Sequence, residues 1–138
     1  MARAAARVLI AAGAVALAWS GVIHLRLWSG GYDAIPLIGP LFLVQGIVSL
    51  LIAVALVVFR RPVLMGAGAL TLAATAGGLL LSAYSGLFGY TESLAVPYAT
   101  ESLYVEFAGA AVLTLAGVLA SPAARGRVRR SCAREDGR

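Results

Sequence analysis

The chain has 138 residues, of which 61% are hydrophobic and only 12% are charged. This balance excludes an ordinary water-soluble domain of this size, because the surplus apolar surface must face lipid. The formal net charge of +5 would suit a nucleic-acid-binding protein, but the arginines lie only where apolar segments end, as membrane topology requires. We therefore expect an integral membrane protein without a nucleic-acid partner. A single cysteine, Cys132, excludes an intrachain disulfide.

Four apolar segments are long enough to cross a bilayer as helices, since about 20 residues span the hydrocarbon core. They are predicted at residues 8–28, 35–59, 63–88 and 102–120. Pro36 and Pro40 fall in or before the first turns of the second segment, where proline is tolerated. Thr100 or Ser102 is the candidate N-cap of the fourth segment.

Small residues recur at every fourth position within these segments, as in Ala74, Gly78 and Ser82. In lipid, small residues let helix backbones approach closely and so favour helix association. The predicted fold class is therefore all-α, a membrane-embedded antiparallel four-helix bundle formed by residues 1–122. Residues 123–138 are expected to be a basic, disordered cytoplasmic tail.

Arginine placement predicts the orientation of the chain. Ten of the eleven arginines fall on one side of a four-span topology: Arg3, Arg7, Arg60, Arg61, Arg125, Arg127, Arg129, Arg130, Arg134 and Arg138. By the positive-inside rule that side is cytoplasmic, which predicts a multi-pass plasma-membrane protein with both termini in the cytoplasm. The alternative for the N-terminus is a cleaved signal peptide, since Ala16-Leu17-Ala18 resembles a cleavage site. The apolar run continues past that site and is long enough to span.

Polar side chains inside membrane spans are costly, so their positions indicate candidate sites. His24, Gln45, Ser82 and Glu106 lie on the small-residue faces, in the outer half or near the middle, and should face inward together; Tyr84 lies at similar depth off these faces. One interpretation is that His24 and Glu106 hydrogen-bond each other or a backbone group and fix helix register. The other is an outward-facing ligand pocket, with His24 as the binding group, Glu106 as its charge partner and Gln45 as the floor.

A second group of residues is expected at the outer membrane interface. Arg26 lies about 200° around the helix from His24, so it should extend to the headgroups or pair with Asp33. Trp28 and Tyr32 are candidate interfacial anchors. Nine of the eleven aromatic residues fall in the outer half or its loops, which favours either an ordered cap or plain anchoring.

Several of these residues carry a family resemblance. They are His24-Leu25-Arg26-Leu27-Trp28, Gly31-Tyr32, Ile35-Pro36, Gly39-Pro40-Leu41-Phe42-Leu43, Gln45, Gly86-Leu87-Phe88-Gly89 and Glu106. This pattern resembles a family of uncharacterised actinobacterial four-helix membrane proteins, a resemblance that implies no activity. The layout is more faintly similar to DoxX-like proteins, some of which are subunits of quinone-linked oxidoreductases. Those usually carry an acidic residue in the second helix where this chain has Gln45.

The sequence contains no phosphate-binding loop, Ser-His-Asp set or metal-ligand cluster, so we expect no catalysis by the chain alone, no cofactor and no metal. The first hypothesis is a non-catalytic accessory subunit that docks to a membrane-protein partner or to a second copy. The second is a binder or carrier of a small amphipathic ligand such as a quinone or lipid. The third is an oligomeric transporter or channel.

Overall fold

The computed structural model describes residues 2–121, and within this range the chain forms four long helices and no β-strand. The helices are α1 (Ala2–Ser29), α2 (Ile38–Phe59), α3 (Pro62–Ser85) and α4 (Ala99–Ala120), with a short 3-10 helix η1 (Tyr32–Ala34) between α1 and α2. The prediction of an all-helical chain with four long helices is confirmed for these residues. The predicted tail, with its arginines and Cys132, lies outside the described range.

All four helices are long and apolar enough to cross a membrane. The candidate spans are Ala4–Ser29, Ile38–Phe59, Pro62–Ser85 and Ala99–Ala120. Large apolar side chains cover the outside of the molecule, among them Val8, Leu51, Val54 and Leu70. An apolar surface of this extent is typical of contact with lipid, and together with the spans it indicates a multi-pass membrane protein.

At two boundaries the helix is shorter than the predicted span. Helix α2 begins at Ile38 instead of residue 35, because the preceding residues form η1 and a turn that contains Pro36. Helix α3 ends at Ser85 instead of residue 88, because Gly86 adopts a positive φ of 76°. Glycine takes this conformation without the steric cost of a Cβ atom, so the apolar residues that follow leave the helix.

The predicted N-cap of the fourth helix is wrong. Helix α4 begins at Ala99 after Tyr98, which has a left-handed backbone (φ 69°) and makes no side-chain capping bond. The Thr100 hydroxyl donates to the backbone carbonyl of Leu94, and the Ser102 hydroxyl donates to the Glu106 carboxyl group. Both side chains therefore have partners other than the amides at the helix start.

Close helix crossings on α1 hold the molecule together. A Cβ atom on Gly21 of α1 would lie 2.9 Å from the carbonyl oxygen of Gly46 on α2. A Cβ atom on Gly109 of α4 would lie 2.6 Å from the Cβ atom of Ala16. Contacts are extensive between α1 and α2, α1 and α4, and α3 and α4, but sparse between α2 and α3. The sparse α2–α3 pair leaves room for a cavity.

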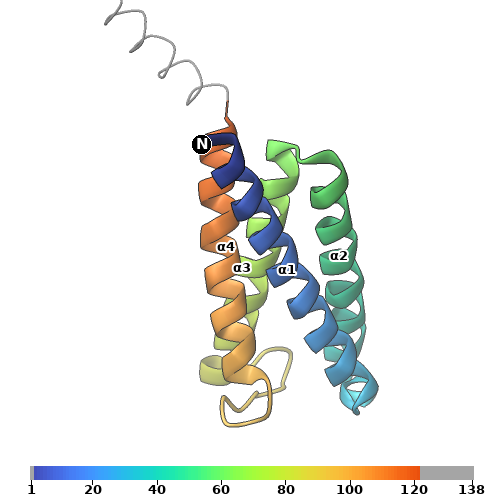
Figure 1. Ribbon diagram of the computed structural model, residues 1–138. Helices are drawn as coiled ribbons and strands as arrows, with labels where there is room; N and C mark the ends of the chain where they lie inside the picture. The colour runs from blue at the N-terminus through green and yellow to red at the C-terminus, as the bar shows by residue number, and fades with distance from the viewer. Residues whose placement is uncertain (1, 122–138) are drawn as a thin grey trace, which may run out of the picture.

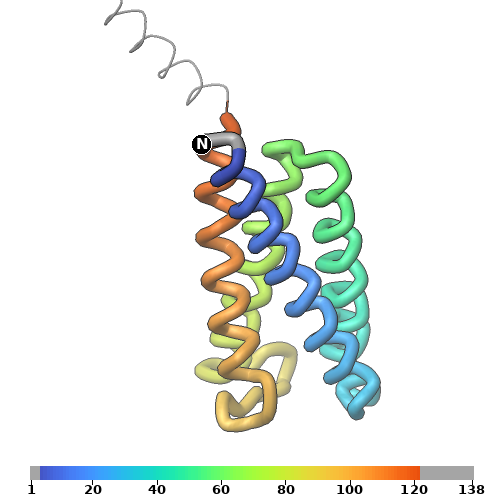
Figure 2. The backbone as a smooth tube through the Cα atoms, in the orientation of Figure 1, coloured from blue at the N-terminus to red at the C-terminus, as the bar shows by residue number. Residues whose placement is uncertain are grey.

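The hydrophobic core and the polar candidate residues lie toward opposite ends of the molecule. Figure 1 shows the start of α1, the turn from α2 to α3 and the end of α4 together at one end. The hydrophobic core lies toward that end: Ile10, Ala14, Leu17, Ala53, Leu56, Met65, Leu72, Leu113 and Ala116. At the other end, η1 and the connection of residues 86–98 fold beneath the helices (Figure 2). The polar side chains predicted as site candidates lie in this second half.

Candidate functional site

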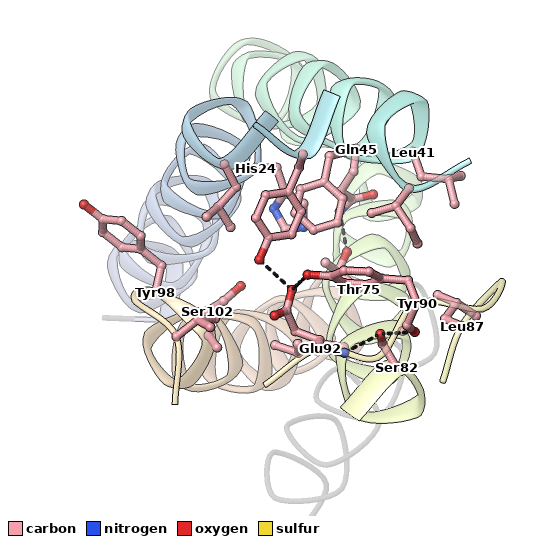
Figure 3. Close-up of a pocket in the computed structure, with 18 of the residues that line it drawn as sticks. His24, Leu41, Gln45, Thr75, Ser82, Leu87, Tyr90, Glu92, Tyr98 and Ser102 are labelled. Atoms are coloured by element: carbon pink, nitrogen blue, oxygen red, sulfur yellow. Dashed lines mark hydrogen bonds between the residues drawn. The ribbon is translucent and has the colours of Figure 1, made fainter. Parts of the chain in front are cut away.

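A cavity of about 290 Å³ lies at the end of the molecule that holds η1 and the 86–98 connection. Its walls come from all four helices, η1 and this connection, and they are mostly apolar. The polar side chains among them are His24, Tyr32, Gln45, Thr75, Ser82, Tyr90, Glu92, Tyr98 and Ser102 (Figure 3). An apolar cavity with a few convergent polar groups is the usual form of a small-molecule site, and this one has the volume of a small ligand.

Small residues on α3 create part of this space. Ala74 and Gly78 line the cavity, and a Cβ atom added to Gly78 would meet no atom within 4 Å. The neighbouring Gly77 is equally open but does not line the cavity. A larger side chain at residue 78 would therefore enter the cavity, whereas one at residue 77 would not.

His24 and Glu106 are linked through Ser20 and not by a direct hydrogen bond. The Nδ1 atom of His24 lies 2.8 Å from the backbone carbonyl oxygen of Ser20, and the Ser20 hydroxyl donates to Glu106 Oε1 at 2.9 Å. A carbonyl oxygen only accepts, so Nδ1 carries the proton. His24 thus bonds a backbone group, as the first of the two predicted interpretations allows, and it also lines the cavity, as the second requires.

Glu106 is fully buried and does not line the cavity. Its Oε1 atom also accepts a hydrogen bond from Ser102 at 2.8 Å, while its Oε2 atom has no partner within residues 2–121. Ser102 does line the cavity, so the Glu106 carboxyl group reaches the cavity wall only through the hydroxyl of this serine. Glu106 is therefore a supporting group and not a direct ligand of the cavity.

Glu92 joins the two connections at this end of the molecule. Its Oε2 atom accepts hydrogen bonds from the hydroxyls of Tyr32 at 2.7 Å and Tyr90 at 3.3 Å, and its Oε1 atom accepts from the Ser93 amide at 3.0 Å. The Tyr32 ring stacks on Phe42 at 4.9 Å. Burial first, and then the hydrogen bonds to Tyr90 and Glu92, raise the pKa of Tyr32 above its usual value. Tyr32, predicted as an interfacial anchor, is thus part of the cavity wall.

Ser82 positions the 86–98 connection over the cavity. Its hydroxyl donates to the carbonyl oxygen of Tyr90 at 3.1 Å and accepts from the amide of Glu92 at 3.2 Å. A reciprocal backbone pair between Leu87 and Tyr90 closes the turn after α3. Ser82 lies at the cavity as expected, but its hydrogen-bonding capacity is largely used by the chain itself.

Gln45 lines the cavity and pairs with α3. Its Nε2 atom donates to the hydroxyls of Ser49, at 3.3 Å, and Thr75. Thr75 in turn donates its own hydroxyl hydrogen to the carbonyl oxygen of Thr71 at 2.8 Å. The sequence did not single out Thr75, because a lone threonine on an apolar helix carries no pattern of its own.

The remaining candidates lie outside the cavity. Tyr84 is 79% exposed and does not line it, which removes Tyr84 from the ligand-binding set. Arg26 and Asp33 are both exposed, and no ion pair joins them within the described residues. Of the two alternatives for Arg26 the pairing is therefore not formed, and extension to the headgroups stays a prediction. Trp28 is partly buried near the end of α1, where an interfacial anchor was expected.

In the described range the chain is thus an all-helical protein with helices long enough to span a membrane and a small cavity at one end. No known protein family, curated protein or solved structure matches this chain. The resemblance to actinobacterial four-helix membrane proteins and to DoxX-like proteins therefore stays a prediction from the sequence.

Proposed function

We propose that the chain is an antiparallel four-helix bundle of the plasma membrane whose cavity binds a small amphipathic ligand, such as a ring-bearing quinone-type molecule or a short lipid. The observation that carries the proposal is the cavity of about 290 Å³, with an apolar wall and polar groups from several elements. Such a combination suits a ligand with an apolar body and one polar head.

The cavity is placed on the outer side of the membrane in this proposal. The turn that holds Arg60 and Arg61 lies at the opposite end of the molecule from the cavity (Figure 1). Arginines mark the cytoplasmic side of membrane proteins, so a cavity at the far end faces outward. A ligand would then enter from the outer leaflet or from the outer solution.

Two neighbouring glycines on α3 give a direct test. The Cβ atom of Gly78→Leu meets nothing within 4 Å and its side chain should extend into the cavity, whereas Gly77→Leu places the same side chain outside it. We expect 4-ethylphenol, 4-ethylanisole or both to raise the thermal unfolding temperature of the detergent-purified wild type and of Gly77→Leu, but not of Gly78→Leu.

The comparison between the two leucine variants removes effects of the probes on the detergent, because both proteins experience the same micelle. Equal shifts in Gly77→Leu and Gly78→Leu would show that the probes do not occupy this cavity. No shift in any of the three proteins would also contradict the proposal for this ligand class.

A second candidate function, an accessory subunit, is favoured by a groove between α3 and α4. Small residues line much of this groove, including Gly66, Ala69, Ala73 and Gly117. In lipid, a groove of small residues allows another helix to approach closely. Purification from the native host in mild detergent should then recover a stoichiometric partner that Gly66→Leu loses and Gly77→Leu retains. A lone chain from all three preparations would count against this function.

A further inference from the structure

Most polar side chains of the cavity share a property that restricts the ligand: their donor hydrogens are already used within the protein. The hydroxyls of Ser82 and Ser102 donate to Tyr90 and Glu106, and that of Thr75 donates to Thr71. The hydroxyls of Tyr32 and Tyr90, two of the three tyrosines that line the cavity, both donate to Glu92. A hydroxyl has a single hydrogen, so each of these groups offers a ligand only its lone pairs.

His24 also presents an acceptor. Its Nδ1–H donates to the Ser20 carbonyl oxygen, so in a neutral imidazole the Nε2 atom has a free lone pair and no hydrogen. None of the hydrogen bonds within the described residues uses Nε2, and this atom is not among the fully enclosed unpaired atoms. Since His24 lines the cavity, Nε2 is available to a bound molecule.

The orientation of the Gln45 side-chain amide also follows from its hydrogen-bond partners. Thr75 gives its only hydroxyl hydrogen to the Thr71 carbonyl oxygen, so its oxygen can only accept from Gln45. The amide must therefore turn its NH₂ group toward Thr75 and Ser49, which leaves the carbonyl oxygen Oε1 without a partner among the residues that the structure describes. The side-chain group that Gln45 has left for a ligand is again an acceptor.

The residues of the 86–98 connection that line the cavity also offer acceptors and few free donors. Glu92 is only 8% exposed, and its carboxylate accepts three hydrogen bonds but meets no basic side chain in the described residues. Four backbone amides of this connection already donate hydrogen bonds within the chain: those of Leu87, Tyr90, Glu92 and Val96. The hydroxyl of Tyr98 points away from the cavity (Figure 3).

From these contacts we infer that the cavity selects ligands that donate hydrogen bonds: an apolar body with a hydroxyl or ammonium head, in preference to molecules whose polar atoms only accept. This inference rests on the proposed function and names its ligand class. The oxygens of an ether, of an ester or of an oxidised quinone only accept, so they could not hydrogen-bond to the acceptor atoms of the cavity. A reduced quinol, in contrast, carries two hydroxyl donors. Anionic heads would in addition face the Glu92 carboxylate.

A matched pair of probes tests the selection, since 4-ethylphenol and 4-ethylanisole differ by the methyl group that replaces the donor hydrogen. The titrations use the purified full-length protein at about pH 8, where an imidazole of ordinary pKa is neutral. We expect the wild type to bind 4-ethylphenol at least about tenfold more tightly than 4-ethylanisole, because a buried site rejects a ligand that leaves its polar groups unpaired.

Two variants locate the effect. His24→Phe keeps a ring at the cavity wall but removes the Nε2 acceptor, so the preference for the phenol should fall several-fold while binding of the anisole persists. Tyr84→Phe is the control, because this side chain is exposed and lies outside the cavity. An unchanged preference in His24→Phe would overturn the role given to this residue and with it the inference.

A third probe, 4-methylbenzylamine, separates the two donor classes. Tighter binding of either the amine or the phenol than of the anisole supports donor selection and assigns the preferred head. Equal affinities of all three probes in the wild type, abolished in Gly78→Leu, would overturn donor selection and leave the proposed function intact. Binding that is the same in wild type and Gly78→Leu would overturn the proposed function itself.

Discussion

Ser20 makes hydrogen bonds to both buried ionisable side chains of the helices, His24 and Glu106. Its hydroxyl is one of two donors to Glu106 in the described part of the chain, and its carbonyl oxygen accepts from His24. Ser20→Ala removes the first bond and keeps the second, so we expect a loss of about 1 kcal/mol in the free energy of unfolding, the range measured for hydrogen bonds inside membranes. Unfolding of the purified protein in mixed micelles with increasing SDS measures this loss.

The control for this measurement is Ser29→Ala. The Ser29 hydroxyl is exposed, and its one hydrogen bond within the described range goes to the carbonyl oxygen of Arg26 in its own helix. If Ser20→Ala unfolds at the same SDS fraction as Ser29→Ala, the bond to Glu106 contributes nothing to stability.

Tyr32 predicts a stability change at alkaline pH. Burial and the hydrogen bonds to Tyr90 and Glu92 raise the pKa of Tyr32 above 10.0, the value of an unperturbed tyrosine. The folded protein therefore holds the phenolic proton more tightly than the unfolded chain does. Stability from this group is fully present below about pH 10 and is lost as the pH rises above it.

Tyr32→Phe should remove this alkaline loss, and it should also lower stability at neutral pH because Glu92 loses a hydrogen-bond donor. Unfolding of wild type and variant from about pH 8 to about pH 11 gives the two profiles. Tyr104→Phe, at an exposed position, is the matched control. Parallel profiles for wild type and Tyr32→Phe would rule out a contribution from this hydroxyl.

The candidate site was only partly visible in the sequence, for a physical reason. His24, Gln45 and Ser82 were predicted because a polar side chain in an apolar helix is conspicuous, and all three line the cavity. Glu92 was missed as a site residue, since it lies in a connection where an acidic residue is ordinary. Its burial depends on Tyr32, 60 residues earlier in the chain, and no local pattern reports such a contact.

At the scale of the helices, alanine substitutions at tightly packed and at open glycines should change stability in opposite directions. Gly109→Ala puts a Cβ atom 2.6 Å from that of Ala16, and both atoms are held by their backbones. Helices α1 and α4 must then separate, and we expect a loss of about 1–3 kcal/mol in the free energy of unfolding, as for other overpacked contacts. The same SDS titration measures this difference.

Gly66→Ala and Gly77→Ala are the controls, since an added Cβ atom meets nothing within 4 Å at either position. Alanine forms helices more readily than glycine, so these variants should be neutral or more stable by up to about 1 kcal/mol. A similar loss in Gly109→Ala and Gly77→Ala would mean that close crossing of α1 and α4 does not hold the molecule together.

The helices were predictable from hydropathy because length and apolar content alone define a candidate span. Their ends were not, because Gly86, Leu87 and Phe88 are as compatible with a span as the residues before them. The structure ends α3 where the backbone of Gly86 turns to a positive φ, and Ser82 then binds the returning chain. A glycine in an apolar run permits such a turn but does not require it.

At the scale of the whole molecule, the separation of arginines from the cavity predicts how the chain sits in the membrane. The Arg60–Arg61 turn and the 86–98 connection lie at opposite ends of the four helices (Figure 1). Moving arginines across a bilayer is costly, so the turn should stay in the cytoplasm and the connection should face outward. The cavity would then be accessible from outside the cell.

Single cysteines introduced at the two ends test this orientation in a Cys132→Ser background. Ala95→Cys, at an exposed position in the connection, should react with a membrane-impermeant thiol reagent in intact cells. Arg61→Cys should react only after the cells are opened, because one of several arginines on that side is replaced and the bias persists. Labelling of both positions in intact cells would contradict four spans, since the two ends would share one side. The reverse pattern would keep four spans but turn the cavity toward the cytoplasm, and the donor-bearing ligand would then have to come from inside the cell.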